Sequence, residues 1–88
     1  MVTLPETLTV KLLLFASYAE WCGRETLPLQ LPRYATVGDL VSQVRNSLPG
    51  GARIPPRPLV AVNAMHARLE TTLNDGDEVA LLPPLAGG

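Results

Sequence analysis

The group best placed to do chemistry in this chain lies at its C-terminal end. Residues 82–88 read Leu-Pro-Pro-Leu-Ala-Gly-Gly and carry no charged or hydrogen-bonding side chain, so their only ionisable group is the Gly88 carboxylate. Apolar side chains gain nothing from exposure to water, and glycine lets the backbone approach another surface closely. Fully extended, residues 84–88 reach roughly 17 Å. The pattern predicts a tail that delivers its carboxylate into a narrow pocket.

The two prolines at the base of this tail indicate where a preceding strand must stop. Pro83 and Pro84 cannot donate ladder hydrogen bonds, and they hold the chain extended. A terminal Gly-Gly also occurs in linkers and expression remnants, and chain ends are often disordered. The tail alone leaves both interpretations open, so the elements that position it must be considered.

Length and composition restrict the class of protein. Eighty-eight residues with 47% hydrophobic and 17% charged side chains fit one small globular domain. The net charge of −1 gives no basic footprint for nucleic acid. The single cysteine, Cys22, excludes an internal disulfide and a cysteine-cluster metal site. Because neither a membrane span nor a signal peptide is visible, we expect a cytoplasmic protein without nucleic-acid or membrane partners.

Hydrophobic periodicity predicts a mixed order of strands and helices. Alternating apolar residues predict strands at 8–15, 25–31, 59–62 and 78–82, with a weaker one at 67–69. Pro28 makes the second of these an edge strand, because proline lacks the ladder donor. A short helix is predicted over 16–22 and a longer one over 37–48, whose start is marked by Thr36 and Asp39. One sheet covered on one face by the longer helix is the economical packing.

This order resembles the ubiquitin-like β-grasp fold, an α+β fold with a mixed sheet of four to five strands and one main helix on one face. Four segments resemble a family more closely: VKLLLFA at 10–16, TVGDL at 36–40, AVN at 61–63 and DGDEVALLPPLAGG at 75–88. They are similar to the small subunit of molybdopterin synthase, a ubiquitin-like sulfur carrier. We therefore divide the chain into a loose extension (1–7), a β-grasp domain (8–82) and an extended flexible tail (83–88).

The resemblance implies a chemical role for Gly88, which follows Gly87. In that family an E1-like partner uses ATP to adenylate the terminal carboxylate, and a sulfur donor such as a cysteine desulfurase or a rhodanese supplies the sulfur of a thiocarboxylate. The tail then enters the large synthase subunit and donates this sulfur to a cyclic pyranopterin precursor, forming the molybdopterin dithiolene. The resemblance implies a heterotetramer of two large and two small subunits, with no cofactor or metal bound by the small, non-catalytic subunit.

Strand parity predicts a partner surface beside the tail. Phe15 and Leu82 fall on the sheet face opposite the main helix, and the first and last strands are neighbours in a β-grasp sheet, so the two side chains are expected to form an exposed apolar patch. The resemblance places both on the family's contact surface. The tail residues expected to contact the partner are Pro83, Pro84, Leu85 and Ala86. The competing interpretation is that the short helix and loops cover Phe15.

Four other residues have more than one interpretation. His66 is a contact at the rim of the partner surface, a pH-sensitive residue or an exposed turn histidine, and it lacks the companions of a metal ligand. Cys22 fits a small buried hydrophobe better than a reactive thiol. Arg53 and Arg57 flank a proline-rich loop, where they are either solvated or in contact with an anion.

Other functions share part of this pattern. A sulfur carrier for thiamin or tRNA thiolation has the same fold and Gly-Gly end, and a ubiquitin-like modifier would be joined to lysine through Gly88. A plain interaction module would carry the two glycines incidentally. Pro83-Pro84 and the length of the chain favour the molybdopterin member of these alternatives.

Overall fold

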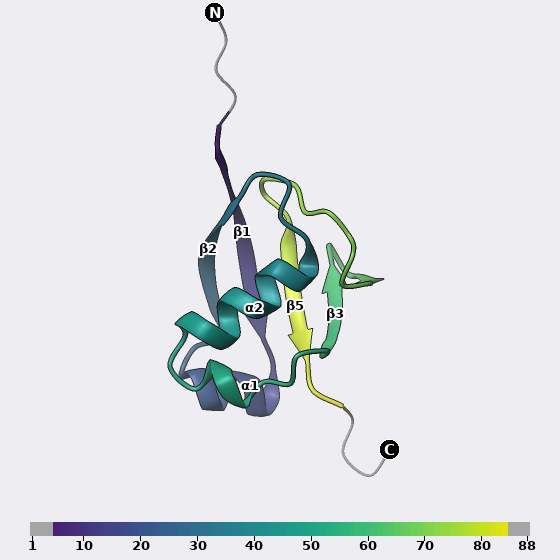
Figure 1. Ribbon diagram of the computed structural model, residues 1–88. Coiled ribbons are helices and arrows are strands. Elements are labelled where there is room, and N and C mark those ends of the chain that lie inside the picture. The colour runs from purple at the N-terminus through teal and green to yellow at the C-terminus, as the bar shows by residue number, and fades with distance from the viewer. Residues whose placement is uncertain (1–4, 85–88) are drawn as a thin grey trace, which may run out of the picture.

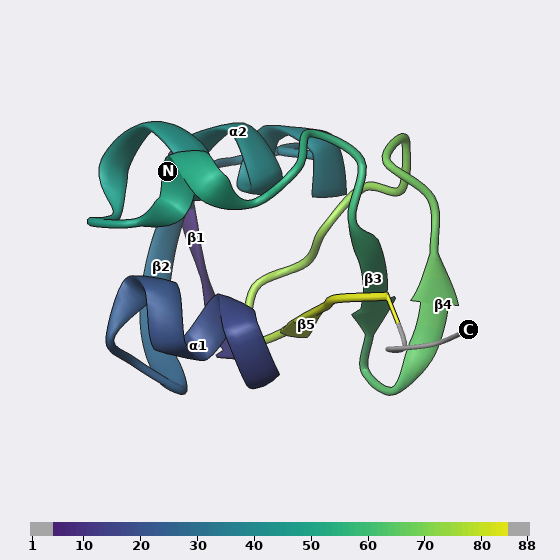
Figure 2. The same cartoon turned by 90° about the horizontal axis from the view of Figure 1, so that it is seen from below.

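The computed structural model of the chain describes residues 5–84, which form one mixed five-stranded sheet in the order β2-β1-β5-β3-β4 (Figure 1). The strands are β1 (Thr7–Leu14), β2 (Thr26–Pro32), β3 (Leu59–Val62), β4 (Met65–Ala67) and β5 (Glu78–Leu82). The helices are α1 (Ala16–Cys22), α2 (Val37–Ser47) and the short 3-10 helix η1 (Gly51–Arg53). Seen along the strands, α2 lies across one face of the sheet (Figure 2), as the sequence predicts.

The parallel pair β1 and β5 forms the centre of the sheet. Leu12 lies beside Val79, and Leu14 lies beside Leu81. All four side chains are buried, because alternate residues of a strand point to the same face and here that face meets α2. The prediction that the first and last strands are neighbours is therefore confirmed, and the end of β5 is fixed in the middle of the fold.

Helix α2 begins at the predicted residue with a capping box. The Thr36 hydroxyl accepts a hydrogen bond from the Asp39 backbone N–H (3.2 Å), and the Asp39 carboxylate accepts one from the Thr36 N–H (2.9 Å). These two bonds satisfy donors that the first helical turn leaves without partners. Its buried stripe consists of Val37, Leu40, Val41 and Val44.

The edge strand β2 offers few free backbone hydrogen-bonding groups to a strand of another chain. Pro28 and Pro32 direct their nitrogens to the free edge but have no N–H to donate. Between them, the carbonyl of Gln30 accepts a hydrogen bond from the side chain of Gln43 on α2 (2.8 Å). This edge is thus protected from pairing with other chains, as natural sheets require.

The prediction of a strand at 67–69 is wrong, because the strand found there, β4, begins two residues earlier, at Met65, and ends at Ala67. Asn63 and Ala64 adopt positive φ values of 50° and 70°, forming a two-residue turn that pairs Val62 directly with Met65. His66 consequently lies within an exposed strand and not in a turn.

Smaller differences concern the ends of elements. β1 takes in Thr7, and the Glu6 carbonyl accepts a hydrogen bond from the Arg33 N–H (2.9 Å), so regular structure starts slightly before the boundary drawn from the sequence. Residues 1–4 of the predicted extension lie outside the described residues. The predicted loop at 50–58 contains η1. None of the helices within residues 5–84 has the length and apolar character needed to cross a membrane.

Candidate functional site

The base of the predicted tail lies at the end of β5. Leu82, the last residue of that strand, lies opposite Leu59 in the antiparallel ladder with β3. Pro83 and Pro84 follow without a regular secondary structure, since neither can donate to a ladder. The remaining residues predicted to enter a partner or carry the sulfur lie outside the described residues: Leu85, Ala86, Gly87 and Gly88. The structure therefore defines where the tail leaves the domain and what surrounds that point.

The face of the sheet that α2 does not cover carries a row of apolar side chains. Leu13 lies beside Ala80, and Ala80 lies opposite Ala61, so the row crosses three adjacent strands. Its ends are more open, because Phe15 is 45% exposed and Leu59 is 48% exposed. We name this surface the outer apolar face; it consists of Leu13, Phe15, Leu59, Ala61, Ala80 and Leu82. Exposed apolar surfaces of this kind often bind partners.

The two predicted contact residues follow a paired position of the parallel strands β1 and β5. Leu14 lies beside Leu81; Leu82 is the last residue of β5, whereas Phe15 comes directly after the end of β1, one residue beyond the strand. Phe15 keeps an extended backbone (φ −119°, ψ 150°) as the residue that precedes α1, which leaves its ring exposed. Phe15 and Leu13 line one hollow on this face, whereas Leu82 lines a second hollow. The outer apolar face thus crosses three adjacent strands and contains two separate hollows.

His66 lies at the margin of the second hollow. It pairs with Ala61 across the β3–β4 ladder. Together with Leu59, Ala61 and Leu82 it lines an open hollow of about 270 Å³ beside the base of the tail. The sequence placed His66 at the rim of a partner surface as one of three interpretations, and this position is compatible with that one.

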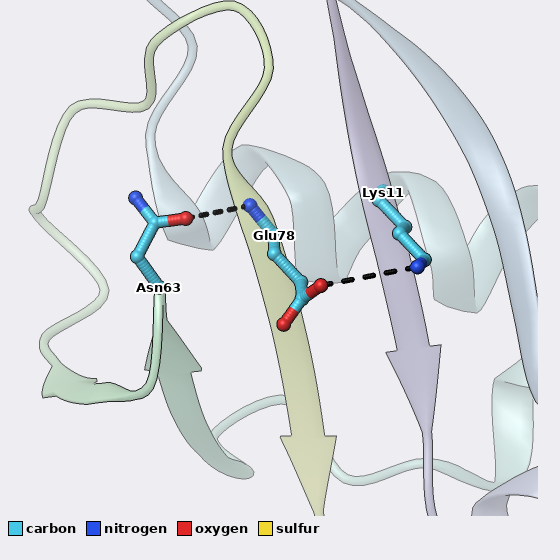
Figure 3. A network of polar contacts seen from close by, with 3 residues as sticks. All are labelled: Lys11, Asn63 and Glu78. Carbon is cyan, nitrogen blue, oxygen red and sulfur yellow. Dashed lines mark hydrogen bonds and ion pairs between the residues drawn. The ribbon is translucent and has the colours of Figure 1, made fainter.

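A polar network holds the opposite end of β5 (Figure 3). The Asp77 carboxylate, only 9% exposed, accepts hydrogen bonds from the side-chain amide of Asn63 (2.9 Å) and from the Asn74 N–H (2.8 Å). The Asn63 side-chain oxygen accepts one from the Glu78 N–H (2.9 Å), and the Glu78 carboxylate lies 3.9 Å from the Lys11 ammonium. The Asn74–Asp77 bond closes the turn before β5, and the bonds of Asn63 join that turn and the start of β5 to the turn after β3. The hydrogen bonds of Asn63 to Asp77 and Glu78 span fourteen and fifteen residues, so they become visible only in the folded chain.

Side chains of α1 pack and do not form a reactive site. Burial raises the pKa of the Cys22 thiol, which keeps it protonated at neutral pH. Burial also raises the pKa of Tyr18, whose ring packs 5.5 Å from that of Trp21. Within residues 5–84, no group of three or more histidine, cysteine or acidic side chains is arranged to hold a metal ion. These residues therefore support the scaffold around the tail.

Sequence comparisons give relatives that span nearly the whole chain. Residues 12–88 match the ThiS family model. A molybdopterin synthase sulfur carrier subunit from Mycobacterium tuberculosis is 39% identical over 82 residues, covering 90% of this chain and 96% of the relative. A protein of the same name from Chlamydomonas reinhardtii is 33% identical over 81 residues, covering 90% and 98% respectively.

Structural comparisons agree with the predicted β-grasp fold. The crystal structure of small archaeal modifier protein 1 from Haloferax volcanii has a TM-score of 0.80 at 29% identity, covering 89% of this chain and 99% of that one. In the complex of subunits 1 and 2 of the molybdopterin-converting factor from Helicobacter pylori, one chain has a TM-score of 0.67 at 23% identity, covering 92% and 100%. A ubiquitin from Caldiarchaeum subterraneum has a TM-score of 0.63 at 20% identity, covering 93% and 99%.

Proposed function

This chain belongs to the ThiS family, and we propose that it is the sulfur-carrier small subunit of a molybdopterin synthase. The observation that carries the proposal is its similarity, over 90% of its length, to sulfur carrier subunits of that synthase. The family match extends through Gly88, so it includes the terminal carboxylate on which the proposed chemistry depends.

The proposed chemistry begins with activation of the Gly88 carboxylate. An ionised carboxylate is a poor electrophile without a leaving group. An E1-like partner joins it to the AMP portion of ATP, releasing pyrophosphate and giving an acyl-adenylate. A persulfide on a cysteine desulfurase or a rhodanese then displaces AMP, forming an acyl disulfide with Gly88. A thiol cleaves the S–S bond of this intermediate, which leaves one sulfur on the terminal carbonyl as a thiocarboxylate and the donor sulfur in a disulfide with that thiol. ATP binds to the partner in this scheme, and the carrier holds no cofactor.

Sulfur donation takes place in the large subunit. The outer apolar face docks on that subunit while residues 84–88 extend roughly 17 Å into its active site, and Gly87 allows the close approach that a narrow channel requires. Pro83, Pro84, Leu85 and Ala86 contact the channel. Each loaded chain carries one sulfur, so the dithiolene of molybdopterin consumes two loaded chains. Two large and two small subunits assemble in the cytoplasm.

Transfer to a pterin distinguishes this role from other sulfur-carrier roles. The thiocarboxylated chain is mixed with a cognate large subunit and the cyclic pyranopterin precursor, and intact mass follows the return of the thiocarboxylate to a carboxylate. We expect the sulfur to be lost only when both are present, with formation of a dithiolene. Transfer of the sulfur to a thiazole precursor or to tRNA, without transfer to the pterin, would contradict the molybdopterin assignment.

A ubiquitin-like modifier is the second candidate, because the H. volcanii protein with the same fold is named a small archaeal modifier protein. In that role Gly88 would form an isopeptide bond with a lysine of another protein. Mass spectrometry of cell extracts tests this directly, since a modifier leaves its C-terminal residues attached to lysine side chains. A deletion of Gly88 is the control.

A further inference from the structure

We propose that His66 makes docking of the large subunit on the outer apolar face sensitive to protonation. The face binds its partner while the imidazole is neutral, and a proton on that ring opposes docking. The inference rests on the proposed function and deepens it, because it assigns a regulated contact to the partner surface. Three features of the described residues support it: the position of His66, the apolar hollow beside it, and the charges of the neighbouring segments.

His66 borders the outer apolar face on the edge strand β4. In the antiparallel β3–β4 ladder it is directly opposite Ala61, and residues directly opposite each other point to the same side of a sheet. Ala61 is in turn opposite Ala80 of β5. The imidazole is exposed and lies beside the apolar row, so a partner that covers this row also covers His66.

The hollow beside His66 is otherwise apolar. The side chains that line it with the imidazole belong to Leu59, Val60, Ala61 and Leu82, and none of them is polar. Leu82 directly precedes the prolines at the base of the tail, so insertion of the tail brings the large subunit over this hollow. An apolar side chain of the large subunit is the occupant that matches the lining.

The described acidic residues leave His66 without a counter-ion. β3 and β4 carry no acidic residue. The acid on the outer side of β5 is Glu78, whose carboxylate lies 3.9 Å from the Lys11 ammonium (Figure 3). Glu70 is the next acid along the chain after β4. Within residues 5–84, no carboxylate lies within 4.0 Å of the imidazole.

Two arginines belong to the segments that adjoin these strands. Arg57 precedes β3 by two residues, and Arg68 directly follows β4. Both are exposed, and a positive charge nearby disfavours a second one. The described part of the chain therefore provides an imidazolium with no compensating negative charge, and only a docked partner could supply one.

Docking changes the cost of holding a proton on His66, because it removes water from the ring. A neutral imidazole tolerates this loss when its single N–H finds an acceptor, whereas an imidazolium loses hydration that apolar surroundings do not replace. The docked carrier therefore binds the proton less tightly than the free carrier. By linkage, affinity is complete where the ring is already neutral and falls as the pH decreases through the range in which histidine gains its proton.

The test measures the Kd of the full chain for a cognate large subunit by calorimetry at about pH 7.5 and about pH 5.5, which span the ordinary range of histidine. His66 is the only histidine of the carrier, but groups of the partner also titrate, so wild type is compared with His66→Gln on the same partner. A ring that must be neutral to bind loses about tenfold in affinity between these pH values. We expect the ratio of the two Kd values to be about tenfold larger for wild type than for the variant.

Proton release gives a second readout. Titrations in two buffers with different ionisation enthalpies count the protons released on docking, and at about pH 6 wild type should release more than the His66→Gln variant. The matched control adds Met65→His to His66→Gln. Met65 is opposite Val62 and 74% exposed. Because successive residues of a strand point to opposite sides, this histidine should not restore the pH dependence.

The outcomes separate the inference from the proposed function. Equal Kd ratios for wild type and His66→Gln would overturn the inference alone. Wild-type binding that tightens relative to the variant as the pH falls would overturn it too, since it would show that the large subunit presents a carboxylate to His66. A wild-type chain that binds the large subunit at neither pH would overturn the proposed function and the inference together.

Discussion

Leu59 and Leu82 lie opposite each other across the β3–β5 ladder, and both line the hollow beside the base of the tail. Leu82 is followed directly by Pro83, so a partner that fills this hollow also contacts the point where the tail departs. Docking on the outer apolar face and insertion of the tail are therefore geometrically coupled. This coupling would let the proposed carrier direct its terminal group as it docks.

Phe15→Asp should prevent copurification with the large subunit. Phe15 is 45% exposed on the outer apolar face, and a carboxylate buried there without a partner would oppose docking. The matched control is Tyr34→Asp, since Tyr34 is 70% exposed and its positive φ of 72° is one that aspartate tolerates. Both variants should retain the wild-type circular dichroism spectrum. Undiminished copurification of the Phe15 variant would remove this residue from the interface.

Gly50→Ala should destabilise the domain more than Gly23→Ala. Both glycines have positive φ, 78° and 73°, so each alanine costs about 1 kcal/mol or more of backbone strain. Only at Gly50 would the new Cβ overlap the Trp21 carbonyl, which adds roughly 1–3 kcal/mol. Urea denaturation measures the two free energies of unfolding. Equal losses would show that the packing of η1 on α1 relaxes freely around the new Cβ.

Asn63→Gly should lower the free energy of unfolding by about 1–3 kcal/mol. Glycine keeps the positive φ of 50° at this position but removes both side-chain hydrogen bonds, leaving the buried Asp77 carboxylate with fewer donors. As a control, Asn46→Ala, exposed on α2, should change stability by no more than about 0.5 kcal/mol. If the Asn63→Gly variant is as stable as wild type in urea, the network contributes little.

Cys22 should react slowly with an alkylating agent while the domain is folded. Burial raises the pKa of its thiol, so at any pH the folded chain holds less thiolate than the unfolded chain, and alkylation should reach half its limiting rate at a higher pH in buffer than in urea. The same shift makes stability fall as pH rises above about 8.5, where the unfolded thiol ionises first. The Cys22→Ser variant should still accept sulfur at Gly88. A variant that cannot form the thiocarboxylate would show that the Cys22 thiol takes part in sulfur transfer.

The sequence predicted the main elements because each had a local cause. Thr36 and Asp39 form the expected capping box, and Pro28 lies on an edge strand because it lacks a donor. The period-two pattern also placed Phe15 and Leu82 on one face. These features depend on residues close in the chain, where propensity and periodicity decide the outcome.

What the sequence did not predict depends on contacts between distant residues. β4 was displaced by two residues, because the turn at Asn63 is tight and is secured by Asp77 and Glu78, fourteen and fifteen positions away. The stacking of Arg53 on Trp21 likewise joins α1 to η1. Periodicity carries no information about such pairs, so they become visible only in the folded chain.

Sulfur loading at Gly88 is tested by the intact mass of the chain after incubation with a cognate adenylating enzyme, ATP and a sulfur donor. We expect a gain equal to the exchange of one oxygen for one sulfur, dependent on ATP and abolished by deletion of Gly88. A wild-type chain that gains no sulfur under these conditions would contradict the assignment as a sulfur carrier.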